Sequence, residues 1–265
     1  MNKRNHSHEY NSLRFSGQRR ATAQFEEAGF FITDVLFDEP TLEGVRLEFE
    51  RVWKEKIEAA QGSDASTQEL TRYRPFLTRL HTVSPKCDAF CRHPIFLQLC
   101  RELLGADADM TWNQAIPKPP APMDNTFAWH QDNWYALHGD YAKDSNLDIL
   151  KANETSFTVW VAISRTIVDN GTLWVLPGRH KEGLLPHVWN EERKEWVGQF
   201  DTSWKIPAVM RAGQMLIFRK YLPHGSGANI SQETRLAYQI AYSVPGLKFG
   251  PSPDILPILR HNEAV

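Results

Sequence analysis

The sequence predicts a mainly β domain, an antiparallel sandwich or barrel, with helices in front of it. After Ala106 the chain consists of short aromatic and β-branched runs separated by Gly, Pro, Asn and Asp, which is typical of antiparallel β structure. Before that point apolar residues recur at roughly helical spacing. No repeat or long linker divides the 265 residues, and all-β chains of this length are often one domain. We therefore expect residues 21–265 to form a single domain.

The first hundred residues contain the predicted helices. Residues 1–20 are polar and basic without apolar periodicity, which indicates a disordered arm. Residues 25–33 predict the end of a short helix, a glycine break and a strand. Residues 41–60 have helical spacing with Thr41 as a plausible start. The stretch 86–104 contains Pro94 in mid-course, so it predicts two short helices rather than one.

The remainder of the chain contains the predicted strands. Residues 157–164 and 172–176 predict a hairpin, because their connection holds Asp169-Asn-Gly, which tolerates the positive φ of tight turns. Two later strands are expected over residues 214–218 and 236–243. The proline-rich stretch 116–122 predicts a stiff loop outside the ladders. We expect this loop to form a lip at the mouth of the barrel.

Charge and composition exclude several classes of partner. Lys and Arg number 30 and Asp and Glu number 32, a net charge of -2, so no basic excess is present to neutralise phosphates and nucleic acid is not an expected partner. No stretch approaches the roughly 20 apolar residues that cross a bilayer, and the polar N-terminus lacks the apolar segment of a signal peptide. No membrane association and a cytoplasmic location are therefore expected.

The three cysteines are interpreted as reduced thiols. An odd, sparse set consisting of Cys87, Cys91 and Cys100 argues against a disulfide framework. Cys87 and Cys91 stand four residues apart, but no second Cys or His pair at zinc-site spacing follows. We expect them to be small core residues.

His130 and Asp132 carry the strongest chemical signal. In an extended chain residues i and i+2 project to the same side, so both can hold one metal ion. By itself such a pair is weak, because ten histidines produce it readily by chance. His224, in a Pro-His-Gly-Ser-Gly segment, would have to come from another strand. Two histidines and one carboxylate leave the opposite metal face open, as in non-haem Fe(II) oxygenases.

Arg235 strengthens this interpretation. It stands 11 residues after His224, and a guanidinium can grip a carboxylate in two places. The alternative for Arg235 is a surface ion pair. A simple metal-binding module has no need of a keto-acid anchor, so Arg235 favours an enzyme.

The order of these parts resembles the phytanoyl-CoA dioxygenase family of Fe(II)/2-oxoglutarate oxygenases. The likeness covers roughly residues 22–245, and its most specific parts are Trp-His-Gln-Asp at 129–132, the stretch 169–178, and His224 with Arg235. It implies a double-stranded β-helix, a jelly-roll, cupin-like barrel, with iron held by His130, Asp132 and His224. It also implies 2-oxoglutarate as cosubstrate, O2 as oxidant, and succinate and CO2 as co-products.

Further site residues follow from the same resemblance. Arg235 would pair with the far carboxylate of 2-oxoglutarate, and Ser226 would add a hydrogen bond. Trp160, Gln114 and Lys118 are also candidates for the cosubstrate pocket. The alternatives are a core aromatic for Trp160 and a solvated side chain for Lys118.

The substrate pocket is expected just after the metal motif. Trp134, two positions past Asp132, is predicted to face the same cavity and to contact substrate. Asn133, Tyr135 and His138 are further candidates. The polar stretch 136–153 is either a substrate lid or a solvated loop.

The leading functional hypothesis is a hydroxylase of a small-molecule metabolite. The same cofactors also serve desaturation, cyclisation or epimerisation in natural-product tailoring, and the sequence leaves this choice open. Halogenation is disfavoured, because halogenating relatives lack the carboxylate of Asp132. A different class is a non-catalytic jelly-roll binding protein. Substrate identity and oligomeric state stay open.

Overall fold

The computed structural model describes residues 18–60, 76–105, 107–120, 125–138, 152–247 and 256–259. Most of the expected N-terminal arm lies outside these residues, although positions 18–20 belong to the first helix. Residues 139–151 of the proposed lid or loop also lie outside them. Within the described ranges no helix has the length and apolar character needed to cross a membrane.

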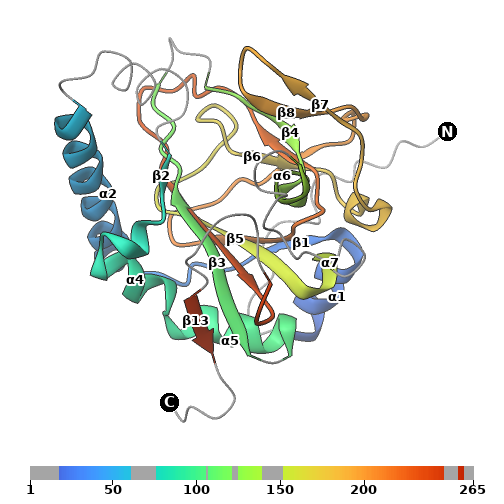
Figure 1. Ribbon diagram of the computed structural model, residues 1–265, viewed down its shortest axis with the longest axis horizontal. Helices are drawn as coiled ribbons and strands as arrows, with labels where there is room; N and C mark the ends of the chain where they lie inside the picture. Colours follow the sequence, from blue (N-terminus) through green and yellow to red (C-terminus); the bar gives the residue numbers. More distant parts are fainter. Residues whose placement is uncertain are drawn as a thin grey trace.

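The described part of the chain contains the helices α1 (Gln18–Ala28), α2 (Glu39–Ala60), η2 (Leu80–Thr82), α4 (Pro85–Cys91), α5 (Pro94–Leu104), α6 (Asp132–Leu137), α7 (Ala152–Thr155) and η4 (Arg179–Glu182). Of these, α2, α4 and α5 lie together on one side of the molecule, whereas α6 lies on the other side (Figure 1). The two helices on either side of Pro94 confirm the predicted break.

Local capping explains where these helices begin. Helix α2 begins two residues before the predicted Thr41, because the side chain of Asp38 accepts a hydrogen bond from the Thr41 amide at 3.0 Å and so caps the helix. Ser84 caps α4 and His93 caps α5, each followed by a proline at the first helical position, where a missing N–H costs nothing.

Two antiparallel sheets face each other and form the predicted jelly roll, a double-stranded β-helix. Among the described residues, the larger sheet has seven strands in the order β1-β10-β5-β12-β3-β13, with β2 also paired to β3. The smaller sheet has the order β4-β11-β6-β9, and β7 and β8 form a separate hairpin. The bounds are β1 (Phe30–Ile32), β2 (Leu77–Thr78), β3 (Ala108–Ala115), β4 (Phe127–His130), β5 (Ser156–Ala162), β6 (Leu173–Val175), β7 (His187–Asn190), β8 (Glu195–Gly198), β9 (Ile206–Pro207), β10 (Met215–Arg219), β11 (His224–Ser226), β12 (Ala237–Ser243) and β13 (Leu256–Leu259).

The period of two along each strand divides the core into two layers. On β5, Val159 and Val161 pack under the helices, together with the three buried cysteines. Trp160 and Ala162 face the opposite way, toward β6 of the smaller sheet. The larger sheet is therefore buried on both faces, which explains why β5, β10 and β12 are buried along their whole length.

The predicted hairpin between residues 157–164 and 172–176 is wrong. The two segments are strands β5 and β6, but β5 pairs with β10 and β12, whereas β6 pairs with β11 and β9. The turn itself is present, with Gly171 at φ 74°. It carries the chain from one sheet to the other, because a jelly roll places consecutive strands in opposite sheets.

Three cross-strand rows lie on the inner face of the larger sheet and position the site. The Trp112 row, at one end, also holds Ala241, Thr158 and Phe218. The Gln114 row follows and also holds Gln239, Trp160 and Leu216. In the Ile116 row, Ile116 bonds to Ala237, which pairs with Ala162. Beyond it, Lys118 and Arg235 form a bridge.

Candidate active site

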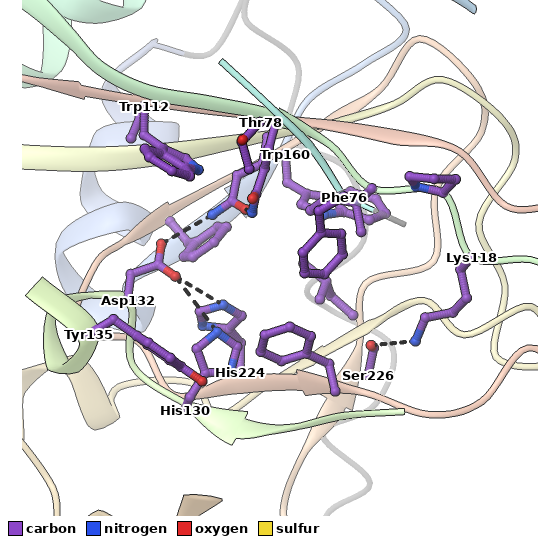
Figure 2. A pocket seen from close by; sticks show the side chains of 18 of the residues that line it. Phe76, Thr78, Trp112, Lys118, His130, Asp132, Tyr135, Trp160, His224 and Ser226 are labelled. Atoms are coloured by element: carbon purple, nitrogen blue, oxygen red, sulfur yellow. Dashed lines mark hydrogen bonds and ion pairs between the residues drawn. The ribbon is translucent and has the colours of Figure 1, made fainter. Parts of the chain in front are cut away.

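His130, Asp132 and His224 converge on one point, as predicted. His130 ends β4 and His224 begins β11, and the two residues are direct partners in the register of these strands. Oδ1 of Asp132 lies 3.8 Å from Nε2 of His130 and 3.5 Å from Nε2 of His224, an arrangement that Figure 2 shows. One ligand atom from each residue lies within 4.8 Å of the other two. The three groups are close enough to share one metal ion.

Hydrogen bonds orient all three side chains for a metal. Nδ1 of His130 bonds to the Ala128 carbonyl at 2.8 Å, and Nδ1 of His224 bonds to the Leu222 carbonyl at 2.9 Å. Because each Nδ1 donates its proton, each Nε2 presents a lone pair to the common point. Oδ2 of Asp132 accepts hydrogen bonds from Thr158 at 2.7 Å and from Gln239 at 3.4 Å. These donors match a two-histidine, one-carboxylate Fe(II) site.

We expect the bonds to Asp132 to affect metal affinity. Groups that orient metal ligands typically contribute about 10- to 100-fold in affinity. The double variant Thr158→Val, Gln239→Leu should therefore weaken Fe(II) binding by about that factor in an anaerobic titration. Thr111→Val is the control, because the Thr111 hydroxyl bonds to the Ala241 carbonyl in the same sheet. Unchanged Fe(II) affinity in the double variant would show that the hydrogen bonds from these two residues do not support metal binding.

The backbone geometry of the motif differs in part from the prediction. Gln131 is extended, with φ -119° and ψ 132°, so His130 and Asp132 do face the same side. Asp132, however, begins helix α6 instead of continuing a strand. Gln131 points away, as expected, and its side-chain amide donates to the carbonyls of Gly183 and Tyr221. This buried amide fixes the motif to two neighbouring loops.

A cavity of about 490 Å³ lies beside the triad. Several of its lining residues were not identified from the sequence. The complete lining consists of Phe76, Thr78, Trp112, Gln114, Ile116, Pro117, Lys118, Asn125, Phe127, His130, Asp132, Tyr135, Trp160, Leu173, Phe218, Lys220, His224, Ser226, Arg235, Gln239 and Ala241. Those not identified from the sequence are Phe76, Thr78, Trp112, Asn125, Phe127, Leu173, Phe218, Lys220, Gln239 and Ala241. Trp112 could have been predicted, because it stands two residues before Gln114 and therefore faces the same side of the strand.

Arg235 is buried at the end of this cavity, not paired at the surface. Its side chain is 1% exposed, and its Cζ lies 5.0 Å from the centre of the Trp160 ring. Its guanidinium donates to the carbonyls of Ile116 at 3.1 Å and Gly171 at 3.2 Å, while Nε has no partner. Among the described residues no carboxylate forms an ion pair with it. Burial lowers the pKa of Arg235 to about 9, so at neutral pH it stays a cation that needs an anion.

Lys118 and Ser226 lie next to Arg235. Lys118 is 5% exposed, so it is not the solvated side chain of the alternative interpretation. Its Nζ donates to the Ser226 hydroxyl and to the Gly227 carbonyl, both at 2.6 Å. This end of the cavity therefore combines two cations and a hydroxyl, which suit a carboxylate.

Gly171 allows this end of the cavity to form. A Cβ at this position would lie 2.5 Å from Cδ of Lys118 and 2.7 Å from the Gly227 carbonyl oxygen. We expect Gly171→Ala to weaken 2-oxoglutarate binding about tenfold by displacing Lys118, and to cost about 1–2 kcal/mol of unfolding free energy from its positive φ. Gly105→Ala is the control, because Gly105 has φ 71° and open space around it. Equal affinity loss in both variants would contradict this role.

The predicted substrate residues after Asp132 are only partly in the cavity. Tyr135 lines it, whereas Trp134, Asn133 and His138 do not. Each helical residue turns the side-chain direction by about 100°, so Trp134 points away from Asp132 and Tyr135 returns to the same side. The prediction for Trp134 assumed a strand and is wrong for this reason.

Trp134 instead holds α6 in place. Its ring stacks between His138, at a centroid distance of 3.9 Å, and His187, at 4.3 Å. Asn133 is completely buried, and its backbone N–H donates to the Lys220 carbonyl at 3.4 Å. These contacts fix the helix that carries Asp132 and Tyr135.

Lys220 is a further cation in the lining that the sequence did not indicate. It follows directly after β10 and is 5% exposed. Burial lowers its pKa to about 8, against the opposing effect of the Asp132 carboxylate.

A family model described as phytanoyl-CoA dioxygenase matches residues 25–237 of this chain. The chain is 25% identical to the peroxisomal phytanoyl-CoA dioxygenase of Rattus norvegicus over 250 residues, which is 85% of this chain and 68% of that protein. It is also 25% identical to the Homo sapiens enzyme of the same name over 233 residues, which is 80% of this chain and 64% of that protein. The matched region thus spans slightly less than two thirds of the human relative.

Solved structures share the fold. The non-haem monooxygenase ThoJ in its apo form aligns with a TM-score of 0.69 and 23% identity, covering 89% of this chain and 82% of ThoJ. The epimerase SnoN, in complex with Fe3+, α-ketoglutarate and nogalamycin RO, aligns with a TM-score of 0.64 and 18% identity, covering 93% of this chain and 97% of SnoN. EvdO2 from Micromonospora carbonacea var. aurantiaca, complexed with 2-oxoglutarate, aligns with a TM-score of 0.61 and 21% identity, covering 88% of this chain and 94% of EvdO2.

Proposed function

This chain belongs to the phytanoyl-CoA dioxygenase family and is an Fe(II)/2-oxoglutarate-dependent oxygenase, and from that premise we propose that it hydroxylates a small-molecule metabolite. Iron, when bound, supplies O2 activation coupled to the decarboxylation of 2-oxoglutarate to succinate and CO2. In the proposed reaction one oxygen atom enters succinate and the other enters the product.

We propose that His130, Asp132 and His224 hold the iron. The support is the fit of the donor set described above, with two neutral imidazole nitrogens and one carboxylate oxygen directed at a common point. Thr158 and Gln239 keep Asp132 in the orientation that leaves Oδ1 for the metal. The cavity on the other side of the triad leaves room for cosubstrate and substrate.

Arg235 is the single observation that carries the proposal. A buried guanidinium with no carboxylate partner in the described residues is costly for a folded protein, and a binding module that holds only a metal gains nothing from it. The far carboxylate of 2-oxoglutarate supplies the missing charge. Lys118 and Ser226 add donors at the same end of the cavity, and Trp160 covers the guanidinium with its ring. Gln114 lies two rows nearer the triad than Arg235, in the same row as Trp160, and donates to Gln239 at 2.5 Å.

The test of hydroxylation is isotopic. Purified protein with Fe(II) and 2-oxoglutarate would be incubated under 18O2 with a panel of metabolites, and succinate release would identify the compounds that stimulate turnover. Hydroxylation predicts one labelled oxygen in succinate and one in the product. Labelled succinate together with an unlabelled product that is oxidised or epimerised would show that the enzyme catalyses one of the other outcomes and not hydroxylation. Absence of succinate with every compound would contradict the proposed function.

A further inference from the structure

The β7–β8 hairpin lies against β4, the strand that ends at His130 (Figure 1). Among the described strands, β4 has a ladder partner only in β11, so its other edge presents backbone groups that need partners. Strand β8 approaches the β4 backbone at both of its ends. Glu195 accepts a hydrogen bond from the Ala128 N–H at 3.3 Å, and a Cβ on Gly198 would lie 3.0 Å from the Trp129 carbonyl oxygen. The hairpin is therefore the outer support of the strand that carries a metal ligand.

An ion pair of the hairpin binds these backbone groups of β4. Glu195 is 1% exposed, and its Oε1 accepts a hydrogen bond from Nε of Arg193 at 2.5 Å, while its Oε2 accepts the bond from Ala128. The Arg193 guanidinium also donates to the Thr126 carbonyl at 2.7 Å. A buried ion pair contributes little net stability compared with apolar packing. We therefore attribute to this pair the fixing of one position of β4 relative to the hairpin.

Ala128 connects the ion pair to the metal site. Its N–H donates to Glu195, and its carbonyl accepts the hydrogen bond from Nδ1 of His130 at 2.8 Å. The second bond selects the tautomer and the ring orientation that direct Nε2 of His130 toward the metal. A shift of Ala128 would lengthen this bond and let the imidazole turn. The Glu195 carboxylate therefore reaches the metal ligand through a single backbone residue.

The next residue of β8 supports the other flank of the metal motif. The Trp196 N–H donates to the Tyr135 hydroxyl at 3.3 Å, and the Tyr135 ring stands edge-on to His130 at a centroid distance of 5.6 Å. The Trp196 ring also meets the Trp134 ring edge-on at 5.8 Å. Two consecutive residues of β8 thus contact β4, just before His130, and α6, which begins at Asp132.

We infer that Glu195, paired with Arg193, is a positioning residue for His130: its carboxylate fixes Ala128, and the Ala128 carbonyl holds the imidazole in the orientation that binds the metal. This inference rests on the function proposed above, which gives His130 to the iron. Glu195 does not belong to the described lining of the cavity, so its effect on the metal passes through His130.

His224 provides a comparison within the same site. Its Nδ1 bonds to the Leu222 carbonyl at 2.9 Å, and the Leu222 N–H in turn donates to the Arg219 carbonyl at 2.8 Å. The residue that orients His224 is therefore held by the backbone after β10 and not by the hairpin. Loss of the Glu195 carboxylate should affect His130 and leave His224 unchanged.

Glu195→Gln tests the inference with almost no change in side-chain volume. The single oxygen of the amide cannot accept from both Arg193 and the Ala128 N–H, so one of these donors then faces the NH2 group. Fe(II) affinity of the full chain in anaerobic titration should fall about tenfold, the lower end of the range for groups that orient metal ligands.

A second measurement separates positioning from a general structural effect. In the Zn(II)-loaded protein the Nδ1 protons of His130 and His224, both bonded to carbonyls, would be followed by proton NMR. Glu195→Gln should shift or broaden one of the two signals and leave the other in place. A general loosening of the fold would not select one histidine.

Asp109→Asn is the matched control. Asp109 is 3% exposed, and its carboxylate likewise accepts a backbone N–H, from Gly246 at 3.0 Å, but it lies on β3 outside the described lining. This variant should lower stability in urea unfolding and keep the wild-type Fe(II) affinity and both imidazole signals. Unchanged Fe(II) affinity in Glu195→Gln, an equal loss in Asp109→Asn, or equal displacement of both imidazole signals would overturn the inference. Failure of the wild type to bind Fe(II) would instead contradict the proposed function.

Discussion

Replacing Asp132 with alanine is expected to abolish turnover of 2-oxoglutarate. The variant removes the only carboxylate of the triad, and its two hydrogen-bond donors, Thr158 and Gln239, then face an empty position. Loss of metal-based stabilisation of several kcal/mol corresponds to a rate decrease of about a thousandfold or more. The measurement is succinate formation with the stimulating compound, together with Fe(II) affinity in anaerobic titration.

The control for this variant is an acid far from the cavity. Asp201→Ala removes an exposed carboxylate that accepts hydrogen bonds from the backbone N–H and the hydroxyl of Ser203, and it should retain wild-type turnover. Circular dichroism would establish that Asp132→Ala is folded. Succinate formation at the parental rate in the Asp132→Ala protein would show that this carboxylate does not hold the metal.

Replacing Arg235 with methionine should weaken 2-oxoglutarate binding about 100-fold. The guanidinium is buried, and a charge-assisted bond in such a site contributes up to about 3 kcal/mol. Binding of the primary substrate should change much less, because Arg235 lies with Lys118 at the end of the cavity proposed for 2-oxoglutarate. Arg235→Lys should recover only part of the affinity, because an ammonium lacks the two-pronged geometry of a guanidinium. The measurement is the dissociation constant of 2-oxoglutarate in the Fe(II) protein.

Stability provides an independent readout for Arg235. A buried cation without a carboxylate partner opposes folding, so the ligand-free Arg235→Met protein should be at least as stable as the wild type in urea unfolding. Arg219→Met is the matched control. Arg219 is also buried, but it pairs with Glu26 and lies over the Phe25 ring, so its loss should lower stability and leave 2-oxoglutarate affinity unchanged. Equal weakening of cosubstrate and substrate binding in Arg235→Met would contradict the anchor role.

The convergence of His130, Asp132 and His224 was predictable because it depends on local geometry and on one strand pairing. His130 and Asp132 share a side for any extended backbone at Gln131, and the structure has that conformation. His224 joins them because β11 pairs with β4 in the register that sets the two histidines opposite each other. The sequence could not specify that register, but the resemblance of the whole arrangement to a known family supplied it.

The prediction failed where long-range topology or a short helix decides the outcome. Helix α6 has only six residues, too few for a periodic pattern, so Trp134 was placed on the wrong side of the backbone. The Asp-Asn-Gly turn was recognised, but whether it joins two strands of one sheet or crosses to the other depends on contacts far away in the chain. Lys220 follows an apolar strand and resembles an ordinary polar strand end, and only the fold reveals that it lines the cavity.

The central claim is that one site binds iron and a keto acid together, and an anaerobic optical titration tests it most directly. Fe(II) and 2-oxoglutarate would be added to the metal-free protein, singly and together, while the visible spectrum is recorded. A chelated keto acid predicts a charge-transfer band that requires both additions, saturates at one equivalent of each, and is lost in Asp132→Ala. A spectrum that stays unchanged when both are present in excess would contradict the claim.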